Sequence, residues 1–123
     1  WSRPAFHSDL WEPICMAGIV RYRHDGKSLI LFSNPHNLEG GREGKPEPGK
    51  SRARKNVSVK ISRDEGLTWP VSKTLEPGPS MYSDIAVTQK GTILCFYGSS
   101  NKPGFAGSGL TLARFNLEWL EQP

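Results

Sequence analysis

Among the residues that could take part in binding or catalysis, the basic ones lie closest together in the sequence. They gather in a polar stretch and the segment after it, at Lys45, Lys50, Arg52, Arg54, Lys55 and Lys60. An arginine in such a cluster can pair with a carboxylate through two parallel hydrogen bonds, because its planar fork matches the carboxylate geometry. Nucleic-acid binding is disfavoured, since no recognition helix or interleaved aromatic platform accompanies the cluster. On residue type alone, a solvated basic loop explains it best.

The histidines and cysteines show no spacing typical of a metal or redox site. His7, His24 and His36 are far apart, and Cys15 and Cys95 do not form a CxxC pair. Solvated histidines are the default for such a pattern. Both cysteines lie in apolar surroundings, which predicts two buried free thiols in strands rather than a disulfide.

One eight-residue segment carries a more specific pattern, S-x-D-x-G-x-T-W, with its fixed positions at Ser62, Asp64, Gly66, Thr68 and Trp69. Glycine allows the positive φ of a tight turn, and the aspartate can accept hydrogen bonds from the backbone of that turn. The two hydroxyls can satisfy further local polar groups, and the tryptophan ring can pack on a neighbouring layer. The pattern therefore predicts a turn between two strands that satisfies its own polar groups.

This pattern resembles the Asp-box of sialidases and related β-propellers, where it is a structural turn remote from the active site. Three further stretches resemble the sialidase family in the same order: F-S-N-P at 32–35, R-x-N-V-S-V at 54–59 and Y-S-x-I at 82–85. The sequence A-R-F-N-L-E-W-L at 113–120 also resembles the end of a sialidase catalytic domain. The resemblance covers nearly the whole chain, which is similar to the C-terminal part of a sialidase (neuraminidase) propeller.

The resemblance implies roles for two residues. Arg54 matches the third of the family's three arginines, which clamp the carboxylate of sialic acid. Tyr82 matches the family's nucleophile, which a neighbouring glutamate activates as base. A tyrosine suits this task because a carboxylate nucleophile would be repelled by the substrate's own carboxylate. The implied activity is that of an exo-α-sialidase that releases terminal sialic acid from glycoconjugates, with no metal and no organic cofactor.

Other parts of the family's site have no match in the sequence. The first two arginines, the acid/base aspartate and the glutamate partner of the tyrosine are expected upstream, and Trp1 resembles the last residue of a preceding Asp-box. Gly98 follows Tyr97 where the family often has a glutamate that steadies the first arginine. We therefore expect this chain alone to be inactive. A non-catalytic Asp-box propeller that binds glycans or proteins stays open as the alternative, as does a relative acting on another acidic sugar.

Short strands must position these residues. Strands are predicted at 16–23, 28–33, 56–62, 68–75, 83–88, 92–97 and 110–115, with no sustained helical period. Asp25 and Gly26 predict a two-residue hairpin turn, and residues 35–53 a long polar surface loop. The pattern fits a sandwich, a barrel or propeller blades. With the resemblance, it predicts an all-β antiparallel propeller in which residues 1–123 form the last two to three of six blades.

Composition agrees with this fold and narrows the partners only slightly. The chain has 13 glycines, 10 prolines and 36% hydrophobic residues, which suits many short segments separated by turns. A net charge of +4 mildly favours an anionic ligand. No apolar run approaches the roughly 20 residues of a membrane span. The expected partners are sialylated glycoconjugates and the upstream part of the propeller; the family suggests a secreted, lysosomal or periplasmic location.

Overall fold

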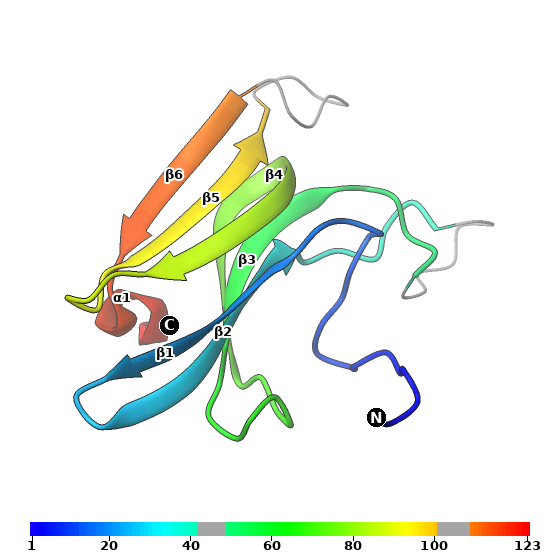
Figure 1. Ribbon diagram of the computed structural model, residues 1–123. Coiled ribbons are helices and arrows are strands. Elements are labelled where there is room, and N and C mark those ends of the chain that lie inside the picture. Colours follow the sequence, from blue (N-terminus) through cyan, green and yellow to red (C-terminus); the bar gives the residue numbers. More distant parts are fainter. Residues whose placement is uncertain (42–48, 101–108) are drawn as a thin grey trace.

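Antiparallel strands dominate the computed structural model, which describes residues 1–41, 49–100 and 109–123. The elements of these ranges are β1 (Gly18–His24), β2 (Lys27–Pro35), β3 (Lys55–Ser62), β4 (Val71–Val87), β5 (Ile93–Ser99), β6 (Gly109–Phe115) and α1 (Leu117–Glu121). Each strand pairs with the next one in sequence, in the order β1-β2-β3-β4-β5-β6 (Figure 1). The prediction of an all-β antiparallel fold is confirmed.

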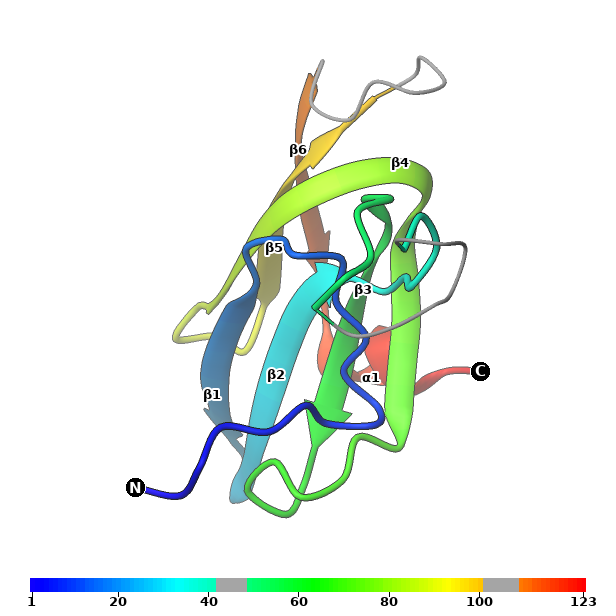
Figure 2. The same cartoon turned by 90° about the vertical axis from the view of Figure 1, so that its right-hand side faces the viewer.

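The long strand β4 belongs to two sheets. Residues 71–79 pair with β3, and residues 80–87 pair with β5. Figure 2 shows β4 arching from one sheet to the other. The prediction of separate strands at 68–75 and 83–88 is wrong. Gly78 takes a φ of 91° and Pro79 still pairs with Lys55, so the Pro-Gly-Pro sequence bends the strand instead of ending it.

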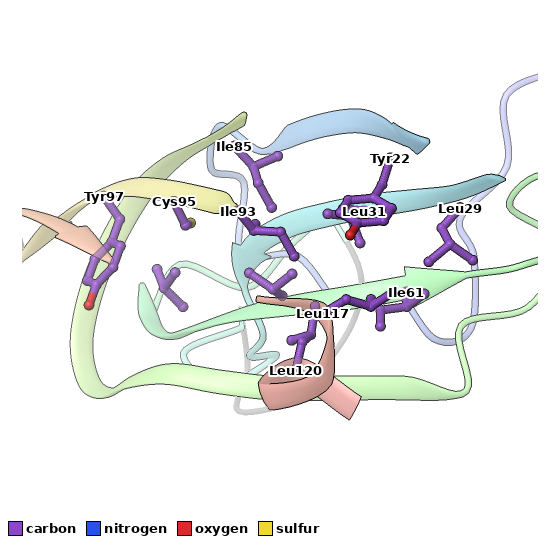
Figure 3. Close-up of a cluster of buried hydrophobic side chains, with 12 residues drawn as sticks. Tyr22, Leu29, Leu31, Ile61, Ile85, Ile93, Cys95, Tyr97, Leu117 and Leu120 are labelled. Carbon is purple, nitrogen blue, oxygen red and sulfur yellow. The ribbon is translucent and has the colours of Figure 1, made fainter. Parts of the chain in front are cut away.

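The hydrophobic core lies where the two sheets face each other (Figure 3). Alternate residues of the strands point into it, as the two-residue period of a strand requires. From the first sheet come Tyr22, Leu29, Leu31, Val57, Val59 and Ile61, and from the second come Ile85, Ile93, Cys95 and Tyr97. Leu117 and Leu120 of α1 join the same cluster. This helix was not predicted, because five residues are too few to show a helical period.

Strands β1 and β4 approach each other closely at Gly18. A Cβ atom at this position would lie 2.8 Å from the backbone nitrogen of Ile85 and 2.9 Å from the Cα of Asp84. Glycine is required here because any side chain would push the two strands apart. The close approach fixes where residues 80–87 run relative to the first sheet.

The turn at residues 62–69 is held by side-chain hydrogen bonds among its own residues. The Ser62 hydroxyl donates to Asp64 Oδ1 at 2.8 Å and accepts from the Gly66 N–H at 2.8 Å. The Asp64 carboxylate also accepts from the Thr68 hydroxyl at 2.6 Å and the Thr68 N–H at 2.9 Å. These Thr68 bonds, followed by the Ser62 bond, lower the pKa of Asp64 to about 2. Trp69 is 7% exposed and packs on the Phe32 ring at 5.7 Å.

The predicted hairpin is confirmed, whereas the prediction for the cysteines is only partly correct. Asp25 and Gly26 take φ values of 49° and 74° between the paired residues His24 and Lys27, which confirms the hairpin. Both cysteines are free, but only Cys95 is buried in a strand. Cys15 is half-buried and precedes β1, so the prediction that both thiols are buried strand residues is wrong for Cys15.

The described ranges hold neither a membrane-spanning helix nor a cluster of metal-ligating side chains. None of the helices there has the length and apolar character needed to cross a membrane. Likewise, the described histidine, cysteine and acidic side chains do not gather in threes or more around a point that could hold a metal ion.

Candidate functional site

Arg54 and Tyr82 lie against each other. The Arg54 guanidinium carbon is 4.8 Å from the centroid of the Tyr82 ring, within the range of a cation–π contact. Tyr82 is 46% exposed and Arg54 is half-buried, so both remain accessible from solvent. The structure therefore brings together the two residues that the sequence selected as substrate-binding and catalytic candidates.

A bulge in β4 turns Tyr82 toward this position. Met81 pairs with Gly98 and Ser83 pairs with Tyr97, so the register between β4 and β5 skips Tyr82. Its φ of 32° is rare for a bulky residue. An extra residue of this kind kinks a strand locally and re-aims its side chain. Here it presents a phenol at the surface from a strand whose neighbouring residues Ser83 and Ile85 are buried.

Irregular pairing at the start of β3 sets the place of Arg54. The register shifts between Lys55 and Ser58, and Asn56 takes a φ of 61°. The Arg54 carbonyl accepts from the Ser80 N–H at 3.2 Å. The Asn56 side-chain oxygen accepts from the Gly78 N–H at 3.0 Å. These two bonds tie the start of β3 to the bend of β4, two residues before Tyr82.

The segment before β1 contacts both candidates. Arg54 Nη2 donates to the Ile14 carbonyl at 2.9 Å, and the Tyr82 N–H donates to Cys15 Sγ at 3.2 Å. The sequence analysis missed both contacts. They had no recognisable signal, because one uses a main-chain carbonyl and the two pairs are 40 and 67 residues apart in sequence.

A mostly apolar cavity of about 440 Å³ adjoins Tyr82. Its lining residues are Met16, Met81, Tyr82, Ser83, Asp84, Phe96, Tyr97, Gly98 and Leu110. Gly98 forms part of this wall between Met81 and Leu110, with which it pairs. A second cavity, of about 650 Å³, lies among β6, α1 and their neighbours and includes neither Arg54 nor Tyr82.

Lys60 is fully buried, so the expectation of a solvated basic cluster is wrong for this member. Its ammonium donates to Asn34 Oδ1 at 2.6 Å, and burial lowers the pKa of Lys60 to about 7. The Asn34 amide in turn donates to the Trp11 carbonyl at 2.5 Å. Trp11 stacks on His36 at 4.6 Å, and burial, aided by Lys60, lowers the pKa of His36 to about 4. These contacts anchor the N-terminal segment on the first sheet.

The remaining basic residues differ in their surroundings. Lys55 pairs with Glu39 at 2.7 Å, and Arg52 is exposed. Lys45 lies outside the described residues, as do parts of the predicted loops at 35–53 and 98–109. Of the cluster, only Arg54 meets Tyr82 among the ring contacts of the described residues.

Known proteins are similar to this chain in sequence and in fold. The sialidase of Micromonospora viridifaciens is 32% identical over 118 residues, which cover 91% of this chain and 15% of that protein. The sialidase of Bacteroides fragilis (strain YCH46) is 32% identical over 96 residues, covering 72% of this chain and 15% of that protein. A solved structure, a Hadza microbial sialidase, matches 88% of this chain and 18% of its own with a TM-score of 0.64 and 28% identity. No family model matches.

The paired antiparallel sheets are therefore part of a sialidase-type β-propeller. The chain belongs to the sialidase family, which confirms the resemblance found in its sequence. It spans only 15% of the length of the first two curated relatives, so the activity of the whole protein is a matter for proposal.

Proposed function

We propose that the complete protein carrying this chain is an exo-α-sialidase, in which Tyr82 is the nucleophile and Arg54 binds the carboxylate of a terminal sialic acid. The observation that carries the proposal is the 4.8 Å contact between the Arg54 guanidinium and the half-exposed Tyr82 ring. The two side chains are far apart in sequence, and both lie at accessible positions. The motifs around Arg54 and Tyr82 resemble those of the sialidase family, and this resemblance implies the same two roles.

Arg54 has the capacity to bind a substrate anion in this position. A guanidinium offers five N–H donors in a fixed fork. Among the described residues, its hydrogen-bond acceptor is the Ile14 carbonyl, reached through Nη2. The donors left over can pair with a carboxylate by two parallel bonds, which fixes the orientation of the sugar above Tyr82.

Tyr82 then carries the covalent step. Its hydroxyl oxygen forms a bond to the anomeric carbon while the bond from that carbon to the aglycone oxygen breaks. The phenolic proton passes to a glutamate base, and an acid delivers a proton to the departing aglycone. Water then attacks the same carbon and gives a proton to the deprotonated acid, while the bond from that carbon to the tyrosine oxygen breaks and the glutamate returns the phenolic proton. We assign the base, the acid and the other two arginines to parts of the protein outside this chain.

The experiment is a rate measurement on the complete protein with a fluorogenic sialoside. We expect Tyr82→Phe to lower kcat by at least about a thousandfold, since the nucleophilic oxygen is removed. Tyr22→Phe is the matched control, because it makes the same change at a buried core tyrosine that is 2% exposed. Unchanged turnover in Tyr82→Phe would remove this residue from the mechanism. We also expect the 123-residue chain alone to show no turnover.

We further propose that the turn at residues 62–69 is the family's Asp-box and that it is structural. The hydroxyls of Ser62 and Thr68 bond to Asp64 within the turn, and Trp69 packs on Phe32. The turn also joins β3 to β4 at the opposite end of these strands from Arg54. Its residues therefore stabilise the first sheet without touching the substrate.

Gly98 favours a second candidate, a non-catalytic propeller that binds sialylated glycans. At this position of β5 there is no side chain to steady an arginine from elsewhere in the propeller, and Asp84 is the acidic residue among those lining the adjoining cavity. The complete protein would then bind a sialoside without hydrolysing it. Calorimetry with sialyllactose, followed by product analysis of the same sample, separates binding alone from turnover. If Gly98→Glu created turnover in an inactive protein, this second candidate would be supported.

A further inference from the structure

The segment that precedes β1 contacts Arg54 and Tyr82 at the same time. The carbonyl of Ile14 accepts from the guanidinium at 2.9 Å, and the sulfur of the next residue, Cys15, accepts from the Tyr82 N–H at 3.2 Å. The bulge leaves the Tyr82 N–H outside the β4–β5 register, so this amide needs a partner from elsewhere. The thiol supplies it.

Backbone strain gathers around this contact. Five described residues other than glycine have positive φ values: Ile14, Asp25, Asn56, Glu65 and Tyr82. Two of them, Asp25 and Glu65, lie in surface turns. The other three are Tyr82 itself, Ile14, whose carbonyl contacts Arg54, and Asn56, two residues after Arg54. Ile14 is β-branched, so its φ of 53° is a true outlier. Strained residues persist where the surrounding structure over-determines them, and they cluster at functional sites.

The segment is anchored independently of Arg54 and Tyr82. The Glu12 carboxylate accepts from the Ile14 N–H at 2.7 Å, which braces the strained residue. Pro13 is among the fully buried residues. On the other side, the Trp11 carbonyl accepts from Asn34, whose side chain is held by the buried Lys60. A backbone segment that is held in place by other contacts can itself position the groups that it touches.

We propose that Ile14 and Cys15 are positioning residues of the site. The Ile14 carbonyl holds one edge of the Arg54 guanidinium, which leaves the other edge for the substrate. The Cys15 sulfur holds the bulged backbone that points the Tyr82 phenol at the anomeric carbon. This inference rests on the proposed sialidase function, because positioning is defined with respect to that reaction.

Kinetics of Cys15 variants in the complete protein test the proposal. With a fluorogenic sialoside, Cys15→Ala lowers kcat about tenfold and leaves KM within twofold, because one hydrogen bond that orients the nucleophile is lost. Cys15→Ser keeps an acceptor and restores kcat to within threefold of the parent. The matched control is Cys95→Ala, which removes a buried core thiol and lowers stability without changing kcat. A kcat within twofold of the parent in Cys15→Ala overturns the proposal.

Hydrogen exchange gives a readout that does not depend on catalysis. In Cys15→Ala the Tyr82 amide exchanges about tenfold faster than in the parent, and in Cys15→Ser it exchanges at nearly the parent rate. Equal exchange in all three proteins overturns the role of the sulfur. If Tyr82→Phe kept full turnover, the proposed function would fail, while the exchange rates would still decide whether Cys15 holds the bulge. If Tyr82→Phe is inactive and Cys15→Ala is fully active, only the positioning role is lost.

Discussion

Two irregular parts of the chain, the turn at residues 62–69 and the site formed by Arg54 and Tyr82, are stabilised by opposite means. In the turn, the hydrogen bonds that join Ser62, Asp64, Gly66 and Thr68 span two to four positions, although Glu65 and Arg63 also pair with distant residues. At the site, Ile14 and Arg54 are 40 positions apart, and Cys15 and Tyr82 are 67 apart. The turn can form from its own sequence. The site exists only after both sheets and the N-terminal segment have assembled.

The largest expected effects that separate these regions are on catalysis, and after Tyr82→Phe the next is that of Arg54→Ala. In the complete protein this change should lower kcat/KM for a fluorogenic sialoside by about a hundredfold, because a charge-assisted pair with the substrate carboxylate is lost. Arg54→Lys should recover only part of the rate, since an ammonium cannot form two parallel bonds. Arg52→Ala, at an exposed neighbouring position, is the control and should leave the rate unchanged.

The next effect is on stability, through Gly18→Ala. The new Cβ would lie 2.8 Å from Ile85 N and 2.9 Å from Asp84 Cα, so the backbones of β1 and β4 must separate. We expect a loss of about 3 kcal/mol in the free energy of unfolding, measured with urea. Activity should fall as well, because the displaced stretch follows Tyr82 directly. Gly109→Ala is the control, since its nearest contacts are at 3.7 Å and a near-neutral result is expected.

Titration of Lys60 should give a smaller effect, visible only as a pH dependence. Its pKa is about 7 in the folded protein and near its ordinary 10.5 when unfolded, so the unfolded chain binds more protons above pH 7. Stability should therefore rise by about 1–2 kcal/mol between pH 7 and 8.5. Lys60→Met should flatten this rise. An identical rise in the variant would show that Lys60 is not its source.

The measurement should end at pH 8.5 because Cys95 acts in the opposite direction at higher pH. Burial raises the pKa of its thiol to about 11, so the unfolded chain loses this proton first and stability falls above pH 9. His36 adds little in this window, since both its ordinary pKa of 6.5 and its folded pKa of about 4 lie below pH 7. Lys60 is also connected to the site by hydrogen bonds. Asn34 binds both the Lys60 ammonium and the Trp11 carbonyl, and Trp11 belongs to the segment that ends at Cys15.

The smallest expected effect belongs to the turn. Ser62→Ala removes a buried hydroxyl that bonds to Asp64 and Gly66, and should cost about 1 kcal/mol in the free energy of unfolding. The kcat of the folded fraction should stay at the parent value. Thermal unfolding together with active-site titration would check both. A reduced kcat at unchanged stability would contradict the division between a structural turn and an assembled site.

The sequence predicted those features whose causes are local. The hairpin at Asp25 and Gly26 needs only two residues that accept positive φ, and the strand before the turn shows its alternation directly. Local pattern also misled, because the Pro-Gly-Pro at 77–79 looked like a break but is held in β4 by Asn56 and Lys55 from β3. That cause lies in another strand, beyond the reach of a local pattern.

The candidate site shows the same limit more sharply. The family motifs identified Arg54 and Tyr82 as candidate site residues. The bulge at Tyr82 and the hydrogen bonds from Arg54 to Ile14 and from Tyr82 to Cys15 had no recognisable pattern in the sequence. The burial of Lys60 was also missed, because a lysine on the polar face of a strand normally reaches water. Here Asn34 of β2 accepts from the Lys60 ammonium and donates to the Trp11 carbonyl of the N-terminal segment.

The sharing of β4 by two sheets has a mechanical consequence. Because a single backbone passes from the ladder with β3 into the ladder with β5, neither sheet can rotate against the other without distorting the arch around Gly78 and Pro79. Arg54 is attached to that arch through Ser80, and Tyr82 is part of it. Shear between the two sheets would therefore change the spacing of the Arg54 guanidinium and the Tyr82 phenol.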